Sequence, residues 1–389
     1  MAPVHSPDPR SALPEPAPQP PEGYLDAVGG QPLLPAARQA WTAASEQAWA
    51  DPARLHHLGR RAGMLLDAAR ASVAASLGIR PEEVFFTSSG PTAVATAVAG
   101  LAATRSAVCG RVIASAVESM AVLEPARRWA DIVDLVPVTT TGRMDLAAFE
   151  DSLSQPTAFA CVQAANAEVG TRQPLLEAAA LAAEANVPLL VHAVQVIGRD
   201  PVPLRWDVLA ASARDWGGPA GVGVLAVRSS ARWTPDASPD RGWVGGFPDI
   251  AGAAAAAAAL EYLAPHRAAE SARLTAIVGL LRETLPAQVP GLLVAGDDLD
   301  RLPHIVTFAC EDVIGEALVI ELDRRGFSVA SGSACTSDAR MPSQVLEAMG
   351  LTAAASIRVS LPFNCTEATV RGFLDALPAA VRAARGAAD

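Results

Sequence analysis

No lysine occurs among the 389 residues of this chain, so its 30 basic residues are all arginine. An arginine guanidinium stays protonated in proteins, and chemistry that uses a lysine amine as a covalent nucleophile is therefore excluded. Genomic bias towards alanine and arginine accounts for the loss of lysines from the surface. It does not account for the loss of a lysine that a reaction requires.

The chain also has fewer basic than acidic residues. The 41 acidic residues outnumber the arginines and give a formal net charge of −11. Nucleic-acid-binding proteins gather basic residues on one face, and anionic membranes attract the same kind of surface. The charge balance therefore argues against direct binding to nucleic acid or to a membrane.

Cysteine is sparse, and its spacing indicates neither a zinc site nor a disulfide framework. The five cysteines are Cys109, Cys161, Cys310, Cys335 and Cys365. A reducing cytoplasm is the expected location. The N-terminus has no basic start followed by an apolar run, so we expect no signal peptide. The alanine run at 253–259 is too short and too weakly apolar to span a bilayer.

The order of hydrophobic runs predicts an α/β fold in two parts. Prolines crowd residues 1–22, which we expect to form a disordered tail. Apolar strand-like runs, separated mostly by helical patterns, then continue to about residue 227; they include 112–114, 132–136, 158–162, 187–191 and 222–227. Such a pattern predicts a mostly parallel sheet covered on both faces. We place the large domain at 23–263 and a smaller α+β domain, opened by a long helix at about 267–285, at 264–389.

One loop in the smaller domain has the composition of a sulfur-handling site. The run Ser331-Gly-Ser-Ala-Cys-Thr-Ser337 follows a strand-like segment at 326–330 and precedes a helical pattern at 342–350. A thiol on a Gly/Ser loop is accessible to water and can move, as a sulfur nucleophile or carrier needs. The alternative is that Cys335 merely ends a strand as a small buried hydrophobe.

The segment from Leu302-Pro-His-Ile-Val306, through that loop, to Ser356-Ile-Arg-Val-Ser360 resembles the C-terminal part of class V aminotransferase-like cysteine desulfurases. The similarity is to the branch that supplies iron–sulfur assembly and tRNA thiolation. It implies a fold type I pyridoxal-phosphate-dependent transferase, with a mostly parallel seven-stranded sheet in the large domain. It also implies that Cys335 holds sulfur as a persulfide and that Arg358 binds the substrate carboxylate, which suits a planar guanidinium. The alternative for Arg358 is a surface charge at a strand end.

The same resemblance allows each cofactor position to be compared, and most of them differ from the family pattern. By this resemblance Pro91 takes the place of the phosphate-binding threonine, and Ser119 that of the histidine that stacks on the cofactor ring. Ala167 takes the place of the asparagine that contacts the ring. His192 replaces the aspartate that protonates the ring nitrogen, and Asp215 replaces the Schiff-base lysine. Asn166, Gln195 and Ser212 are retained. The intact Gly-Pro-x-Gly after Asp215 fixes the register. A proline at position 91 removes both a hydroxyl and a backbone N–H from the phosphate site.

Two further features of this region follow from the same comparison. The segment that supplies a phosphate contact across the family's dimer is shortened here to residues 247–252. His192 and Asp215 take the places of an acid and a base. We hypothesise that they pair with each other, or that Asp215 pairs with Arg214, since pairing lowers the cost of burying charge. The alternative is that both are solvated.

These observations favour a cysteine desulfurase-like protein that has lost pyridoxal phosphate and binds no metal. We expect a pseudoenzyme subunit or persulfide acceptor that forms a dimer, either with a second copy or with an active cysteine desulfurase, and serves a sulfur-carrier or thiolation protein. Two alternatives stay open. One is a cofactor-independent enzyme with Cys335 as nucleophile, where Cys365 could act as a resolving thiol. The other is a purely structural or regulatory partner, in which Cys335 is incidental.

Overall fold

The computed structural model describes residues 21–105, 109–202, 205–235, 241–310, 313–331, 343–351 and 355–386. The predicted tail, up to residue 20, and the Cys335 loop from residue 332 lie outside these ranges. In the described part of the chain no helix is both long and apolar enough to cross a membrane.

A seven-stranded, mostly parallel sheet forms the centre of the large domain, as the sequence predicts. Its order is β1-β7-β6-β5-β4-β2-β3, and β7 alone runs antiparallel to its neighbours. The strands are β1 (Val84–Thr87), β2 (Arg111–Ser115), β3 (Ile132–Val136), β4 (Phe159–Gln163), β5 (Leu189–His192), β6 (Val208–Ser212) and β7 (Gly223–Val227). Strands β4, β5, β6 and β7 are buried along their whole length, because helices cover both faces of the sheet.

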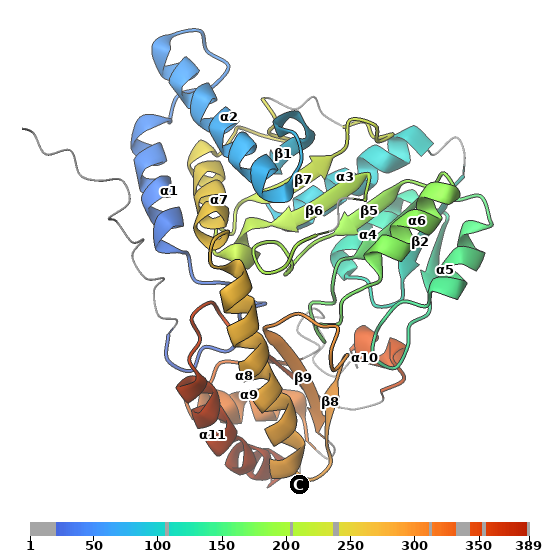
Figure 1. Ribbon diagram of the computed structural model, residues 1–389, viewed down its shortest axis with the longest axis vertical. Helices are drawn as coiled ribbons and strands as arrows, with labels where there is room; N and C mark the ends of the chain where they lie inside the picture. The colour runs from blue at the N-terminus through green and yellow to red at the C-terminus, as the bar shows by residue number, and fades with distance from the viewer. Residues whose placement is uncertain are drawn as a thin grey trace, which may run out of the picture.

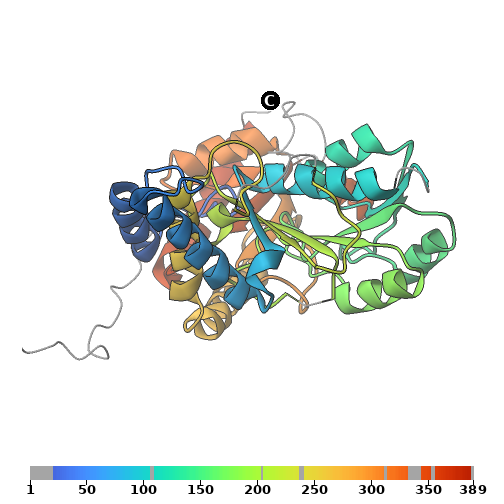
Figure 2. The same cartoon turned by 90° about the horizontal axis from the view of Figure 1, so that it is seen from above.

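Two separate apolar cores show which helices cover which face (Figure 2). On one face pack α3 (Gly90–Arg105) and α4 (Met120–Trp129). On the other lie α2 (His57–Leu77), α5 (Leu146–Leu153), α6 (Leu175–Glu184) and α7 (Ile250–Leu263), with α1 (Pro35–Gln47) packed against α7. The alanine run at 253–259 is thus part of the packed helix α7. Its small side chains let α1 and α2 approach closely.

The smaller domain carries its own core beneath an antiparallel sheet of order β10-β11-β9-β8 (Figure 1). Its strands are β8 (Leu292–Ala295), β9 (Ile305–Cys310), β10 (Ala330–Ser331) and β11 (Ala355–Ser360). Its helices are α8 (Arg267–Gln288), α9 (Gly315–Asp323), α10 (Gln344–Ala348) and α11 (Glu367–Gly386). The predicted long helix is α8, and the helical pattern at 342–350 is α10.

The strand expected at 326–330 is shorter than the sequence suggests, since β10 covers only Ala330–Ser331. Gly326 has a φ of +87°, which breaks an extended run, and Ser328 forms an isolated bridge with Tyr24 instead of joining the ladder. The partner in that bridge comes from the start of the chain.

The first described residues cross from the large domain to the small one. Leu25 donates its N–H to the Ser328 carbonyl at 2.9 Å and accepts the Ser360 N–H at 2.8 Å. Its side chain is fully buried in the small-domain core. The N-terminal segment at 23–28 therefore ties the two domains together beside β10 and β11.

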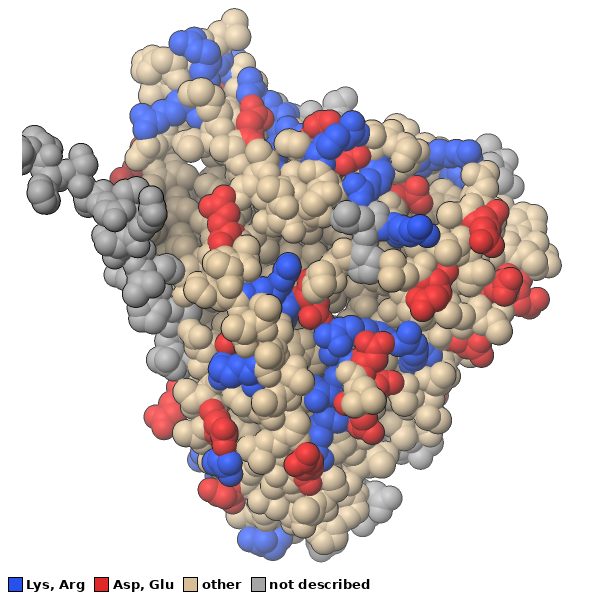
Figure 3. Space-filling model, viewed as in Figure 1, with Lys and Arg blue, Asp and Glu red and all other residues tan. Residues whose placement is uncertain are grey.

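Arginines and acidic residues are interspersed over the face shown in Figure 3. Near the junction of the domains, Arg172 pairs with Asp200 at 2.5 Å and lies 3.6 Å from Asp300, which Arg143 also contacts. These arginines are compensated by carboxylates and leave no single-sign patch among themselves.

Candidate functional site

The candidate site lies at the carboxyl ends of β5 and β6, where doubly wound sheets bind ligands. His192 is the last residue of β5 and Ser212 the last of β6. The N-terminus of α3 packs directly against this edge, since a Cβ added at Gly90 would lie 2.6 Å from the Ser212 Cβ. Most positions named in the sequence comparison therefore meet in one place.

His192 is held by a carboxylate that the sequence analysis missed. Its Nδ1 lies 3.1 Å from Oε1 of Glu118, and both side chains are buried. The same oxygen accepts the Ser119 backbone N–H at 2.8 Å, while Oε2 has no hydrogen-bond partner among the described residues. The hypothesis that His192 pairs with Asp215 is therefore wrong, because Glu118 is the residue within hydrogen-bond distance. Glu118 directly precedes Ser119 in the sequence, and this position was the signal that could have identified it.

Ser119 is the N-cap residue of α4. Its Oγ accepts the Ala121 backbone N–H at 3.2 Å and so caps the N-terminus of α4. A serine is among the best N-cap residues because it satisfies one of the unpaired amides of the first turn. The residue at the ring-stacking position thus presents a short hydroxyl to the helix and no aromatic face.

Asp215 is completely buried and bonded to Gln195. Gln195 Nε2 donates to Oδ1 at 2.9 Å and its backbone N–H to Oδ2 at 3.4 Å, with Arg214 Nε at 4.0 Å from Oδ1. The alternative pair with Arg214 is therefore present, at the limit of ion-pair distance. Burial raises the pKa of Asp215 to about 6, although Arg214 and the Gln195 amide act in the opposite direction.

The chain of contacts continues into the small domain. Gln195 Oε1 lies 3.2 Å from Nε2 of His304, a fully buried residue just before β9. Burial, with Arg199 and Arg358 nearby, lowers the pKa of His304 well below its usual value, so this imidazole is neutral. Gln195 is thus retained as a bridge between a carboxylate and a histidine that sequence reasoning did not identify.

The residues at the phosphate end are already engaged with one another. Ser89 Oγ accepts the Thr92 backbone N–H at 3.1 Å and lies 2.7 Å from Thr92 Oγ1. Pro91, in the first turn of α3, has no N–H to offer. An oxyanion at this helix start would find fewer free amides than the helix geometry ordinarily supplies.

Asn166 is used to build a turn. Its Oδ1 accepts the N–H groups of Glu168 and Val169 at 2.8 and 2.9 Å, and Nδ2 donates to the Val117 carbonyl at 3.1 Å. Ala167, at the ring-contacting position, is half-buried and has no polar group to present. Ser212 stands at the end of β6 against α3, with no side-chain hydrogen bond to η2 (Ala213–Trp216).

Arg358 lies inside β11, and its side chain is only 9% exposed. It is therefore not the surface charge considered as an alternative. Its NH2 group donates to Asp26 Oδ1 at 3.1 Å, and its buried Nε has no hydrogen-bond partner among the described residues. The predicted carboxylate-binding arginine thus already holds a carboxylate, supplied by the N-terminal segment of the same chain.

Glu168 is a further acid that sequence reasoning missed, although it lies in the Asn166–Gly170 run, and the residue is only partly exposed. Burial raises the pKa of its carboxyl to about 7, while a hydrogen bond with Ser343 and the charge of Arg358 act to lower it. Its Oε1 is buried without a hydrogen-bond partner in the described ranges. Ser343 precedes α10, so this small-domain helix is connected to the candidate site.

Cys335 lies outside the described residues, so its role as the persulfide-forming nucleophile stays a prediction. Cys365 is fully buried in the small-domain core, and burial raises the pKa of its thiol to about 11. A protonated, inaccessible thiol does not act as a resolving nucleophile. Within the described ranges no group of three or more His, Cys, Asp or Glu residues could hold a metal ion.

Comparison with known proteins gives a consistent result. The aminotransferase class-V family matches residues 23–373. An IscS-like cysteine desulfurase of Mycobacterium tuberculosis is 34% identical over 384 residues, covering 94% of this chain and 98% of the relative. A cysteine desulfurase of Cereibacter sphaeroides is 36% identical over 372 residues, covering 91% and 94%. The solved structure of a NifS-like protein superimposes with a TM-score of 0.84 at 25% identity, covering 92% and 98%.

The pyridoxal phosphate implied by this fold family does not fit the residues present. The chain has no lysine, and a buried carboxylate, Asp215, bonded to Gln195, lies at the position that the sequence comparison assigns to the amine. His192, paired with Glu118, lies at the position that the same comparison assigns to an acid, and Pro91 offers no N–H at the start of α3. No step of a reaction is therefore derived through that cofactor.

Proposed function

Because this chain belongs to the aminotransferase class-V family and is cysteine desulfurase-like, we propose that it is a pseudoenzyme subunit or persulfide acceptor in a sulfur-transfer or thiolation complex. The observation that carries the proposal is Asp215. A fully buried carboxylate, hydrogen-bonded on both oxygens by Gln195, takes the place of the amine on which the family's chemistry depends. The relatives are named as active desulfurases, and this chain would depend on such a protein for its sulfur.

Exposed large apolar side chains of the large domain support a partner subunit. Trp49 and Leu55, between α1 and α2, are 66% and 87% exposed, Met64 on α2 is 64% exposed, and Phe247 before α7 is 63% exposed. Large apolar side chains gathered on a surface are typical of an interaction site. We propose that the protein forms a dimer through the surface that carries these side chains. The partner is a second copy or an active cysteine desulfurase, in the cytoplasm.

The sulfur step requires only a persulfide donor and a thiolate. The Cys335 thiolate attacks the outer sulfur of the partner's persulfide, a new S–S bond forms, and the partner's cysteine leaves as a thiolate. No electron is lost or gained overall, since one persulfide replaces another. Cys161, Cys310 and Cys365 are buried in the structure, which leaves them poorly placed for this exchange.

Native mass spectrometry of the chain purified from its own host tests the proposal. We expect a complex with an active desulfurase in which this chain carries no pyridoxal phosphate and Cys335 carries one added sulfur atom. The Cys335→Ser variant should lose that sulfur, and the matched variant Cys109→Ser should keep it.

Two other outcomes are decisive. A cofactor-free homodimer with an unmodified thiol, together with full function of Cys335→Ser in the host, would replace this proposal with a structural or regulatory binder. Pyridoxal phosphate bound to this chain itself, and not to a partner, would overturn the interpretation of the pocket.

A further inference from the structure

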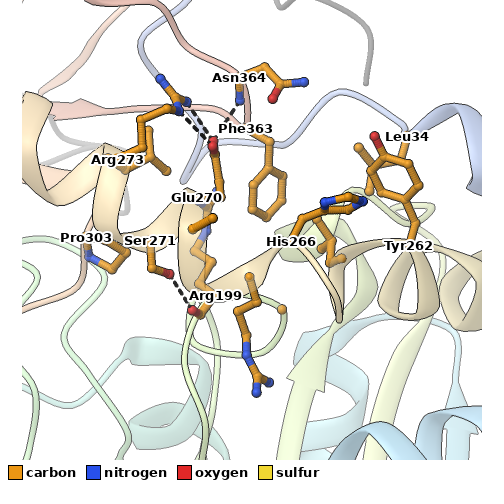
Figure 4. Close-up of a pocket in the computed structure, with 15 residues that line it drawn as sticks. Leu34, Arg199, Tyr262, His266, Glu270, Ser271, Arg273, Pro303, Phe363 and Asn364 are labelled. Atoms are coloured by element: carbon orange, nitrogen blue, oxygen red, sulfur yellow. Dashed lines mark hydrogen bonds and ion pairs between the residues drawn. The ribbon is translucent and has the colours of Figure 1, made fainter. Parts of the chain in front are cut away.

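A cavity of about 280 Å³ lies where the large domain, the start of α8 and the small domain meet (Figure 4). It is separate from the candidate site described above. The large domain contributes Arg199 and Tyr262, and the loop after β11 contributes Phe363 and Asn364. The remaining lining is partly apolar: Leu34, Leu263, Leu274 and Pro303.

Arg199 is the unusual feature of this cavity. Its side chain is 2% exposed, yet none of its three guanidinium nitrogens has a hydrogen-bond partner among the described residues. A buried cation without hydrogen bonds is costly, and buried arginines are ordinarily bonded to carboxylates or carbonyls. Burial lowers the pKa of Arg199 to about 9, which leaves it charged at neutral pH.

The nearest carboxylates are already bonded to other groups. Asp215 is bonded to Gln195, and Asp200 to Arg172. Glu270 makes two hydrogen bonds with Arg273, at 2.7 and 2.8 Å, and accepts the Asn364 backbone N–H at 2.9 Å. The carboxylates attract Arg199 at longer range but do not satisfy its donors.

The lining has an excess of positive charge in a chain that is acidic overall. Arg199, Arg267 and Arg273 face the single carboxylate of Glu270, which Arg273 neutralises. The N-terminus of α8 lies at the same place, and its N-cap residue His266 makes no side-chain cap. An uncapped helix start adds partial positive charge and unpaired amides.

We propose that this cavity binds a small organic anion, with an oxyanion head bonded to Arg199 and an apolar body against the surrounding side chains. The shared chemistry of the head is that of a carboxylate or a phosphate, both of which accept parallel hydrogen bonds from a guanidinium. The apolar lining residues and the cavity volume suit a body about the size of one aromatic ring.

Phe363 is the group that an entering anion has to move. Its ring lies over the guanidinium of Arg199, with 4.2 Å between the guanidinium carbon and the ring centroid. Figure 4 shows the ring between Glu270 on one side and His266 and Tyr262 on the other. The anion exchanges a cation–π contact for charge-assisted hydrogen bonds, which are the stronger interaction.

Isothermal titration calorimetry of the full chain in low-chloride buffer tests this site, with benzoate, phenyl phosphate and inorganic phosphate as probes. We expect saturable binding of one benzoate or one phenyl phosphate per chain, and weaker binding of inorganic phosphate. The comparison between benzoate and phenyl phosphate identifies the head, and inorganic phosphate tests the need for the apolar body.

Three variants make the assignment specific. Arg199→Gln should raise the dissociation constant by about tenfold or more, since hydrogen bonds to a charged group are lost. Arg267→Gln, on the half-exposed rim, should weaken binding severalfold while leaving the core intact. Arg371→Gln removes the same charge from the exposed face of α11 and should change nothing.

The site is overturned if none of the probes binds saturably, or if Arg267→Gln and Arg371→Gln bind as the unchanged chain does. Arg267→Gln decides the matter if Arg199→Gln does not fold. Equal binding of inorganic phosphate and phenyl phosphate would refute the role given to the apolar body. These outcomes do not depend on the sulfur-transfer proposal, which is read from a different assay.

Discussion

Three carboxylates, of which Glu118 and Asp215 are buried and Glu168 is partly exposed, determine what the candidate site can hold. Glu118 contacts His192, Asp215 is bonded to Gln195, and Glu168 keeps one oxygen without a hydrogen-bond partner in the described structure. A pocket with these groups favours cations and neutral donors over a phosphate. A carboxylate at Asp215, the position that the sequence comparison assigns to the family's lysine, would change the charge of the site as well as its chemistry.

Glu168 makes the stability of the protein depend on pH. Its carboxyl has a folded-state pKa of about 7, above the ordinary 4.5, so between these values the folded state binds more protons than the unfolded state. The free energy of unfolding therefore falls as the pH rises through this window. We expect Glu168→Gln to remove this fall and to stabilise the protein at pH 8 by roughly 1–3 kcal/mol.

Urea unfolding of both proteins between pH 6 and pH 8 measures this difference. Asp215, with a pKa raised to about 6, acts with the same sign at lower pH, so the comparison is made above that value. Glu367→Gln, in an exposed pair on α11, is the matched control and should show no change of slope. Parallel pH profiles of Glu168→Gln and the unchanged chain would contradict the assignment.

The Asp26–Arg358 ion pair predicts a second effect at the scale of single residues. Asp26→Asn leaves the largely buried guanidinium of Arg358 without its carboxylate, and we expect a loss of about 1–2 kcal/mol in the free energy of unfolding. Chemical denaturation against Glu367→Gln, whose ion pair is exposed and contributes little, provides the measurement. An equal effect of the two substitutions would mean that Asp26 does not stabilise Arg358.

At the scale of elements, β7 packs closely against the loop that follows β1, and this packing gives a testable prediction. A Cβ at Gly223 would lie 2.0 Å from the carbonyl oxygen of Ser89, a backbone atom that has no room to move. We expect Gly223→Ala to destabilise the protein by about 2 kcal/mol or more, because β7 has to shift away from β1.

The control for this effect lies two residues earlier in the chain. A Cβ at Gly221 would have no heavy atom within 4 Å, so Gly221→Ala should be nearly neutral. Thermal unfolding followed by circular dichroism distinguishes the two variants. A similar melting temperature for both would show that β7 adjusts without cost.

The elements also show where sequence reasoning reaches its limit. Long apolar runs correctly predicted the buried strands β4 and β7, because burial on both faces requires a continuous apolar sequence. The run at 326–330 did not become a full strand, because Gly326 turns the chain and Ser328 bonds to a segment 300 residues away in the sequence. No pattern near residues 326–330 in the sequence indicates a partner so far away.

At the scale of the whole molecule, the N-terminal segment is one of several connections between the large domain and the small one. Deletion of residues 1–20 should leave thermal stability unchanged, because a proline-rich tail is expected to contribute no packing. Deletion of residues 1–28 removes the buried Leu25 and its hydrogen bonds to the small domain, and should cost about 3 kcal/mol or more.

Differential scanning calorimetry of the two truncated chains measures both effects, and the shorter deletion serves as the control for the longer one. The longer deletion should also separate the unfolding transitions of the two domains, since it removes a tie between them. A single unchanged transition in both would mean that the segment at 23–28 is dispensable.

The sequence alone determined the absence of lysine and predicted the α/β class, because composition and hydrophobic order are properties of the chain itself. The changed cofactor positions stay a prediction from the family resemblance. Only the tertiary structure decided the pairing of the buried charges. His192 meets Glu118 and not Asp215, Arg358 meets Asp26, and Arg199 lies under Phe363 without a hydrogen-bonded carboxylate. These partners are distant in sequence, so no local pattern predicts them. Their pairing matters for stability because a buried charge without a partner is costly.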